Sequence, residues 1–213
     1  MSKRVFALVA TLPLVVWSSC QQKRDVDTSP ETVRFAVDRS LLGASIVDTA
    51  LGVEFSPPRG WEKVSAQSLK RAEGSALVRL PDTAKHSKGA VPRLLYAWTH
   101  AESGSVVIVS AVPHFDTQDS SSSLQEYLQL YRSEPDLEDI RASVFYDGTF
   151  KVHQLLVTRQ ASVLFKMIFS VGRMPSPVEF DFTIPRDAYP QLIKTIESVA
   201  GSLELHQTNT SFN

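Results

Sequence analysis

Residues 163–184 read VLFKMIFSVGRMPSPVEFDFTI, and this stretch decides the fold. Its two apolar runs, 163–171 and 178–184, are separated by a glycine and two prolines, so they predict two β-strands. In each strand, alternate side chains form one aromatic-rich face. The opposite faces carry Lys166, Ser170, Glu179, Asp181 and Thr183. We therefore expect antiparallel strands with that side exposed or only partly covered.

Further strands are expected on the N-terminal side of this pair. Residues 94–100 and 106–112 flank a turn with Gly104 and predict a hairpin. The second of these strands is apolar on both faces and is therefore placed centrally in the sheet. The remaining expected strands are residues 143–146, 150–158, a strand or hairpin from Ile46 to Phe55 that ends at Pro57, and a weaker strand at residues 77–80.

Three helices complete the expected pattern. Ser65 is the expected N-cap of a short helix, and Ser123 with Glu126 forms a capping box for a second. The third has Asp187 as N-cap and Gly201 as its C-terminal stop. Its apolar stripe comprises Tyr189, Leu192, Ile193, Ile196, Val199 and Ala200, and a short strand at residues 202–205 follows. The predicted class is α+β, a central antiparallel sheet with helices packed on its faces.

The N-terminus has the pattern of an export signal. Lys3 and Arg4 precede 13 mostly apolar residues, 5–17, a run shorter than the roughly 20 that span a bilayer. Small residues then precede Cys20, the single cysteine of the chain. This arrangement resembles the lipobox of bacterial lipoproteins, although Trp17 stands where that family usually has an aliphatic residue. The resemblance implies cleavage after residue 19 and attachment of lipid, palmitate included, to Cys20.

The expected organisation follows from this start. Residues 1–19 are the signal peptide, 20–43 the lipidated cysteine and a polar tether, 44–205 one domain, and 206–213 a polar tail. Lipid on Cys20 predicts a membrane-anchored protein of the cell envelope, with the outer membrane favoured over the inner one in a Gram-negative cell because Gln21 follows the cysteine. The formal net charge is −1 and no arginine-rich run occurs, which excludes nucleic acid as an expected partner.

A second resemblance covers about residues 44–205. The segment Gly52-Val53-Glu54-Phe55-Ser56-Pro57-Pro58-Arg59-Gly60-Trp61 resembles the opening of PsbP-like domains, and residues 184–189 with 196–203 look like their closing helix and strand. This resemblance implies a PsbP-like sandwich of sheet and helices, and an accessory or binding role rather than catalysis. It transfers no site residue and no cofactor, because no shared catalytic motif can be matched here.

Candidate chemistry is sparse. His100, Glu102, His114 and Asp116 are the nearest approach to a metal-ligand cluster, but the hairpin places the two pairs near opposite ends of its ladder, so solvated loop residues are the favoured interpretation. The serines at 120–123 lack a Gly-x-Ser-x-Gly elbow and are better explained as a polar loop leading into a helix cap. Trp61 and Trp98 are expected to pack in the core rather than line a ligand pocket.

Three classes of function are compatible with these patterns. The favoured hypothesis is a non-catalytic accessory lipoprotein that binds a protein partner in the cell envelope. The alternatives are a small-ligand or metal-binding lipoprotein and an enzyme with an unrecognised site. No catalytic residue and no cofactor are predicted.

Overall fold

The computed structural model describes residues 31–79, 92–113, 115–132, 134–172 and 174–206. Its main element is a seven-stranded, fully antiparallel sheet. In spatial order the strands are β3 (Glu62–Lys63), β4 (Arg93–His100), β5 (Ser105–Ala111), β9 (Val178–Pro185), β8 (Ser162–Ser170), β7 (Phe150–Arg159) and β6 (Leu137–Asp147). The β8–β9 pair that the sequence predicted includes the central strand, β9, and Lys166 lies directly opposite Asp181.

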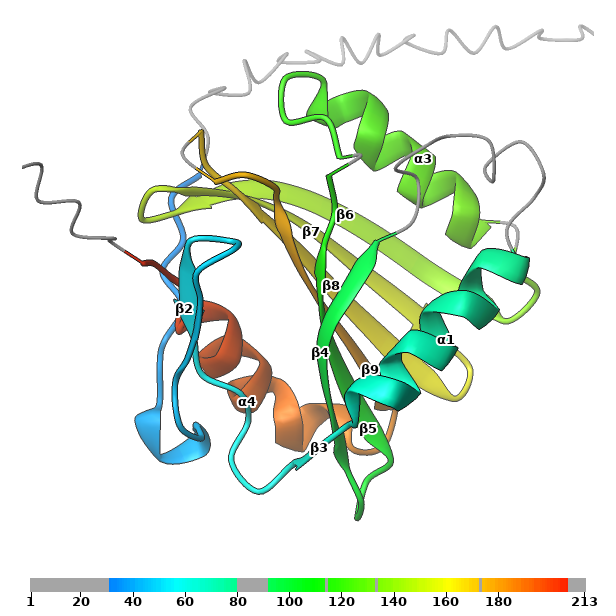
Figure 1. The fold of residues 1–213 in the computed structure, drawn as a ribbon. Helices are drawn as coiled ribbons and strands as arrows, with labels where there is room; N and C mark the ends of the chain where they lie inside the picture. Colours follow the sequence, from blue (N-terminus) through cyan, green and yellow to red (C-terminus); the bar gives the residue numbers. More distant parts are fainter. Residues whose placement is uncertain (1–30, 80–91, 114, 133, 173, 207–213) are drawn as a thin grey trace, which may run out of the picture.

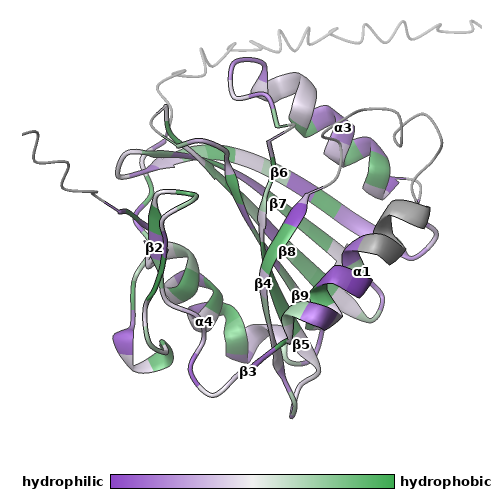
Figure 2. Cartoon of the chain, in the orientation of Figure 1, coloured by the Kyte–Doolittle hydropathy of each residue, from purple (hydrophilic) through white to green (hydrophobic). Residues whose placement is uncertain are grey.

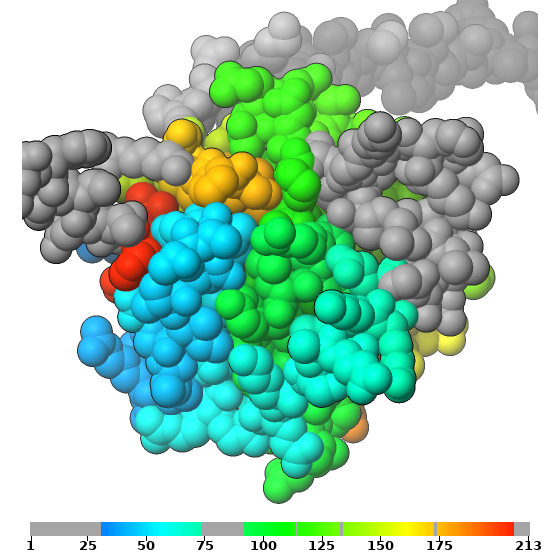
Figure 3. All heavy atoms as spheres, viewed as in Figure 1, coloured from blue at the N-terminus to red at the C-terminus, as the bar shows by residue number. Residues whose placement is uncertain are grey.

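A smaller sheet of three strands stands beside the large one. Its antiparallel order is β1 (Ile46–Asp48), β2 (Val53–Phe55) and β10 (Glu204–Leu205), so the two ends of the domain meet here. Figure 3 shows the β1–β2 hairpin, in blue to cyan, packed against the green β4–β5 hairpin. A hydrogen bond from the Tyr96 hydroxyl to Asp48 Oδ2, 3.0 Å long, joins the two hairpins.

Helices cover both faces of the large sheet (Figure 1). The helix α4 (Tyr189–Gly201) and the small sheet lie on one face, while α1 (Ala66–Arg79) and α3 (Ser120–Arg132) lie on the other. A single 3₁₀ turn, η1 (Arg39–Leu41), precedes β1. The expected α+β class, a central antiparallel sheet with helices on its faces, is thus confirmed.

The main core lies between the sheet and α4. Phe55, Phe169 and Phe180 are fully buried there, and the Phe180 ring lies 5.5 Å from Phe55 and 5.7 Å from Phe169 in edge-to-face contacts. Trp98 belongs to this core as expected, and Trp61 is half-buried, packing both against the core and against the His100 ring. In Figure 2 hydrophobic residues, in green, recur along the central strands and along α4. A second, smaller cluster of apolar residues packs beneath α3.

The structure corrects four expectations about individual elements. Residues 77–79, expected to form a strand, belong to the C-terminal end of α1. The N-cap of α4 is Ala188, with no side-chain cap, instead of Asp187. Ile193, expected in the buried stripe of α4, is 36% exposed, whereas Thr195 and Ser198 are buried. The capping side chain of α3 is Asp119, whose Oδ1 accepts from the Ser122 N–H, instead of Ser123.

Gly201 also has a different role from the one expected. It is the last residue of α4 and has no left-handed conformation. A Cβ at this position would lie 2.5 Å from Phe35 Cβ and 2.9 Å from Val37 Cγ2. Glycine is therefore required so that the N-terminal segment can cross the end of the helix.

This crossing places the start of the folded region before residue 44. The Phe35 ring packs edge-on against Phe145 at 5.8 Å, and the Asp38 N–H donates to Ser198 Oγ of α4 over 3.0 Å. Residues 31–43 thus lie against the domain instead of forming part of the tether.

Candidate functional site

The predicted metal-ligand residues do not converge. His100 ends β4 and pairs with Ser105 across the turn, whereas Arg93 pairs with Ala111 at the far end of the same ladder, from which Asp116 follows. His114 lies outside the described residues. Across the part of the chain that the structure describes, no group of three or more His, Cys, Asp or Glu side chains could hold a metal ion.

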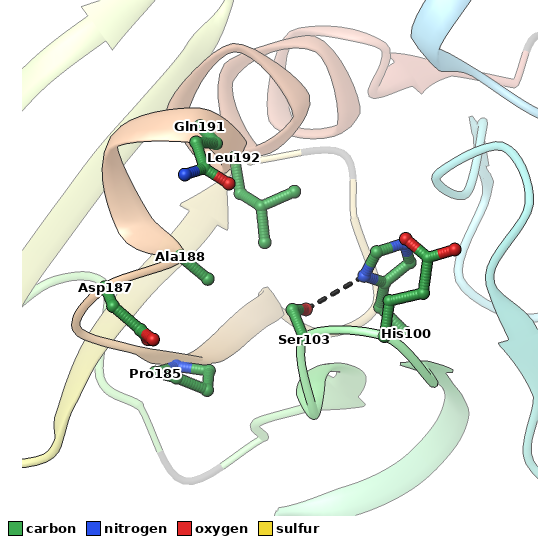
Figure 4. A pocket seen from close by; sticks show the side chains of 8 residues that line it. His100, Ser103, Pro185, Asp187, Ala188, Gln191 and Leu192 are labelled. Carbon is green, nitrogen blue, oxygen red and sulfur yellow. Dashed lines mark hydrogen bonds between the residues drawn. The ribbon is translucent and has the colours of Figure 1, made fainter.

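His100 does line a cavity, of about 480 Å³, between the β4–β5 turn and the start of α4 (Figure 4). Its Nδ1 lies 2.8 Å from Ser103 Oγ, which lies 2.7 Å from Ser105 Oγ. The wall also includes Glu102, Pro185, Asp187, Ala188, Gln191 and Leu192. A serine hydroxyl beside an imidazole is the pairing that nucleophilic catalysis uses.

The arrangement around Ser103 nevertheless fits a turn better than a catalytic group. Ser103 Oγ also accepts from the Ser105 N–H at 3.3 Å, which is a local bond that stabilises the turn. In Figure 4 the Asp187 carboxylate lies on the wall opposite His100 and does not orient the imidazole. A triad needs a third group that holds the base.

The most unusual charged group is buried between the sheet and α3. The Lys166 side chain is 4% exposed and that of Glu179 is 3% exposed. Lys166 Nζ lies 2.6 Å from Glu179 Oε1 and 2.7 Å from Asp181 Oδ2. The Tyr127 hydroxyl of α3 donates to Glu179 Oε2 over 3.1 Å. We call Lys166, Glu179, Asp181 and Tyr127 the buried charge cluster.

The protonation states in this cluster are fixed by its neighbours. Burial lowers the pKa of Lys166, but the carboxylates of Asp181 and Glu179 outweigh that effect and hold it well above its usual range. Burial, assisted by the charge of Glu179, raises the pKa of Tyr127 strongly. Both groups are therefore protonated donors at neutral pH and supply neither a base nor a nucleophile. The cluster ties α3 to the sheet.

The sequence predicted that this side of β8 and β9 is exposed or only partly covered. Lys166, Ser170 and Glu179 are buried while Thr183 is exposed, so the side is partly covered. The covering elements are α1 and α3, and a cavity of about 160 Å³ is left between Glu73 of α1 and Lys166, Glu179 and Asp181. Asp181 Oδ1 is buried and has no hydrogen-bond partner among the described residues.

His153 is a second buried polar group on the same side of the sheet. It is fully buried on β7, its ring lies 4.9 Å from that of Phe115, and neither ring nitrogen has a hydrogen-bond partner in the described part of the structure. Burial, together with the charge of Lys151, lowers its pKa to about 4. The imidazole is thus neutral at neutral pH and packs as an apolar ring.

The outer edge of the large sheet is formed by β6, the longest strand. The backbone N–H and C=O of Tyr146 bond outward, to residues 31 and 33, and no bulge interrupts β6 between Asp139 and Asp147. Because the direction of these groups alternates along a strand, Ile140, Ala142 and Val144 also form non-hydrogen-bonded pairs with β7, and their N–H and C=O groups point away from the sheet. None of these groups bonds to another described residue. The other edge is β3, two residues long. We call residues 140–144 the open edge.

The neighbouring part of β6 is already occupied by the chain's own N-terminal segment. Thr32 forms a parallel bridge with Tyr146. The Val33 N–H donates to the Tyr146 carbonyl and the Tyr146 N–H donates to the Glu31 carbonyl, both over 2.9 Å. An extended segment therefore does pair with this edge, immediately beside the open part.

Comparison with known proteins adds information about the fold. No protein-family model and no curated protein matches the chain. Solved structures similar to it include the following two. The cyanobacterial PsbP protein (CyanoP) of Synechocystis sp. PCC 6803 is 18% identical over 76% of this chain and 91% of that chain, with a TM-score of 0.45. The Ran-binding protein Mog1p of Saccharomyces cerevisiae is 10% identical over 78% and 96%, with a TM-score of 0.44.

These similarities concern the fold alone. PsbP, whose domain family the sequence resembles, is among the solved structures with a similar arrangement. Cys20 and the predicted export signal lie outside the described residues. Among the described helices, none is both long and apolar enough to cross a membrane.

Sequence reasoning missed both the buried charge cluster and the open edge. Lys166 and Asp181 were placed on the polar sides of adjacent strands, which was a usable signal for an ion pair. The N-terminal half of β6 was missed because the acidic sequence Leu137-Glu138-Asp139 has low strand propensity. The alternation of Ile140, Ala142 and Val144 could have revealed it.

Proposed function

We propose that this protein is a membrane-anchored accessory lipoprotein of the cell envelope whose domain binds another protein and performs no catalysis. The observation that supports it best is the open edge of β6. Addition of a strand to such an edge is a common way for a domain to bind an extended peptide, because main-chain hydrogen bonds provide affinity without a deep pocket. An edge of this kind is a liability unless something covers it.

The position of the N-terminal segment supports a partner near the membrane. Because Thr32 is fixed on β6, only residues 21–31 connect the domain to Cys20. Fully extended, this connection reaches no more than about 40 Å. Lipid on Cys20 would thus hold the β6 edge close to the bilayer, and the partner's effective concentration would rise toward the millimolar range.

The anchor is tested by labelling with palmitate. We expect the wild-type protein to be labelled and Cys20→Ala to lose both the label and its retention in the membrane fraction. Ser18→Ala, which keeps a small residue before the cysteine, is the matched control and should still be labelled. Label that survives in Cys20→Ala would contradict the lipoprotein proposal.

The protein-binding role is tested by crosslinking intact membranes, purifying the full-length protein and identifying what is attached. We expect a specific protein partner with the wild type and much less of it with Cys20→Ala. Recovery of this protein alone from crosslinked membranes would contradict the accessory role.

The second candidate function is binding of a small ligand in the cavity beside His100. Its volume of about 480 Å³ is within the roughly 300–1,000 Å³ of typical ligand sites. A thermal-shift screen against metabolites and metal ions distinguishes the two candidates, because a ligand that binds the folded state raises the melting temperature. Ser103→Ala should then abolish such a shift if this cavity is the site.

A further inference from the structure

We infer, on the basis of the proposed function, that the open edge of β6 receives an extended segment of about five residues from the partner. The segment carries apolar side chains on the side of α3 and polar ones on the other. Residues 31–33 of the chain's own N-terminal segment act as a stop that ends this binding site and prevents two copies of the protein from pairing through it.

The backbone of β6 defines the length of the site. Three residues, Ile140, Ala142 and Val144, present outward N–H and C=O groups, and the next outward residue, Tyr146, is paired with residues 31 and 33. In a continuous ladder an added strand of about five residues would satisfy all three. The seated segment at Tyr146 shows that the geometry of this edge accepts a strand.

The side chains of β6 define the alternation expected in the partner. On the α3 side, Ile140 packs against the apolar cluster beneath the helix, and Val144 is 40% exposed. On the other side lie an ion pair of Asp139 with Arg141, 2.7 Å apart, and the exposed Ser143. Neighbouring side chains on one face of a sheet interact, so apolar residues are favoured at every second position of the added strand.

A second copy of the protein does not fit this site. Two-fold pairing of two β6 strands is antiparallel. In such a dimer the two-fold axis passes through one position of β6, and residues equally far from it on the two copies lie opposite each other. If the axis lies between Ile140 and Val144, the residue of the second copy opposite Tyr146 is one of residues 134–142. Thr32 already occupies that place. The partner must therefore be a strand that ends, or turns away, before Tyr146.

The residues before Glu31 are also a poor occupant. Among the described residues, the pairing of the chain's own segment with β6 ends at the Glu31 carbonyl, which accepts from the Tyr146 N–H. The Glu31 N–H makes no bond to Val144, the next outward residue of β6. Upstream, the sequence contains Asp25, Asp27 and Pro30, residue types that are depleted in strands.

The test measures fluorescence anisotropy with full-length protein in detergent. The probe is a fluorescein-labelled peptide of nine residues in which valine and threonine alternate between two terminal lysines. Ala142→Pro removes one outward N–H but no bond of the β6–β7 ladder, since Ala142 is in a non-hydrogen-bonded pair. Ala142→Val keeps that N–H and is the matched control. We expect Ala142→Pro to weaken binding at least tenfold and Ala142→Val to remain within twofold, with unchanged circular dichroism for both.

Two further peptides, each methylated on alternate backbone nitrogens, identify the binding mode. A strand presents only every second N–H to its neighbour, so one methylated version should lose binding while the other keeps it. Equal binding of both versions, equal affinity for Ala142→Pro and wild type, or no binding of the unmethylated peptide would overturn the inference. The inference would also be overturned if deletion of residues 21–30 increased the affinity for the peptide. A dimer of the protein crosslinked through Val144 would overturn it as well.

The failure of this inference is distinguishable from failure of the proposed function. If a partner is recovered from crosslinked membranes equally well with Ala142→Pro, the protein-binding role stands and the site is elsewhere. If the peptide binds as expected but no partner is recovered, the open edge can bind an added strand and the proposed accessory role is wrong.

Discussion

The ammonium group of Lys166 lies between two carboxylates in the layer between the sheet and α3. Removing it by Lys166→Met leaves Glu179 and Asp181 buried without their counter-ion, so we expect a loss of about 3–5 kcal/mol in the free energy of unfolding. Adding Glu179→Gln and Asp181→Asn to the same protein should recover most of that loss. Denaturant unfolding is the measurement, and a cost below about 1 kcal/mol for Lys166→Met would contradict the assigned ion pairs.

His153 predicts a specific dependence of stability on pH. Its pKa is about 4 in the folded protein and near 6.5 in an unfolded chain. Between these values the unfolded chain binds a proton that the folded protein does not, so stability falls as the pH falls from about 6.5 to about 4. The loss amounts to at most about 3 kcal/mol.

The control for this prediction is His153→Leu, which removes the titrating group and keeps an apolar side chain. The difference in unfolding free energy between wild type and variant should change with pH over this window and be constant above pH 7. A difference that does not vary with pH would show that the imidazole is solvated or hydrogen-bonded in the folded state.

At the level of elements, α4 provides the clearest test of the core. Ile196 is 1% exposed and packs with the main core, so Ile196→Ala should cost about 2–5 kcal/mol. Lys194 lies on the exposed side of the same helix, and Lys194→Ala should stay within about 0.5 kcal/mol. Thermal or denaturant unfolding measures both, and equal effects would contradict the packing of α4.

The elements also show what local sequence could and could not predict. The β4–β5 hairpin and the strands β7 to β9 followed from runs of apolar residues and their alternation, because strands bury side chains in a regular pattern. The extension of α1 through residues 77–79 did not follow, since a short apolar run fits a helix as well as a strand. The packing of Phe35 over Gly201 depends on residues far apart in the chain and has no local signal.

For the molecule as a whole, the candidate site depends on how strands are ordered, which local patterns do not specify. The sequence predicted an accessory protein held at a membrane but assigned no surface to the partner. Strand order places β6 at the edge, and the contact between Thr32 and Tyr146 places the N-terminal connection beside it. Together these features place the start of the described N-terminal segment and the open edge in one region of the molecule.

The most direct test of this account is site-specific photocrosslinking in the cell's own membranes. A photoreactive amino acid in place of Val144 should link the full-length protein to one partner protein, and Ala142→Pro in the same chain should abolish the product. The same probe in place of Ile193, exposed on α4, should give no such product. No partner at position 144, or a product that persists with Ala142→Pro and also forms from position 193, would contradict the central claim.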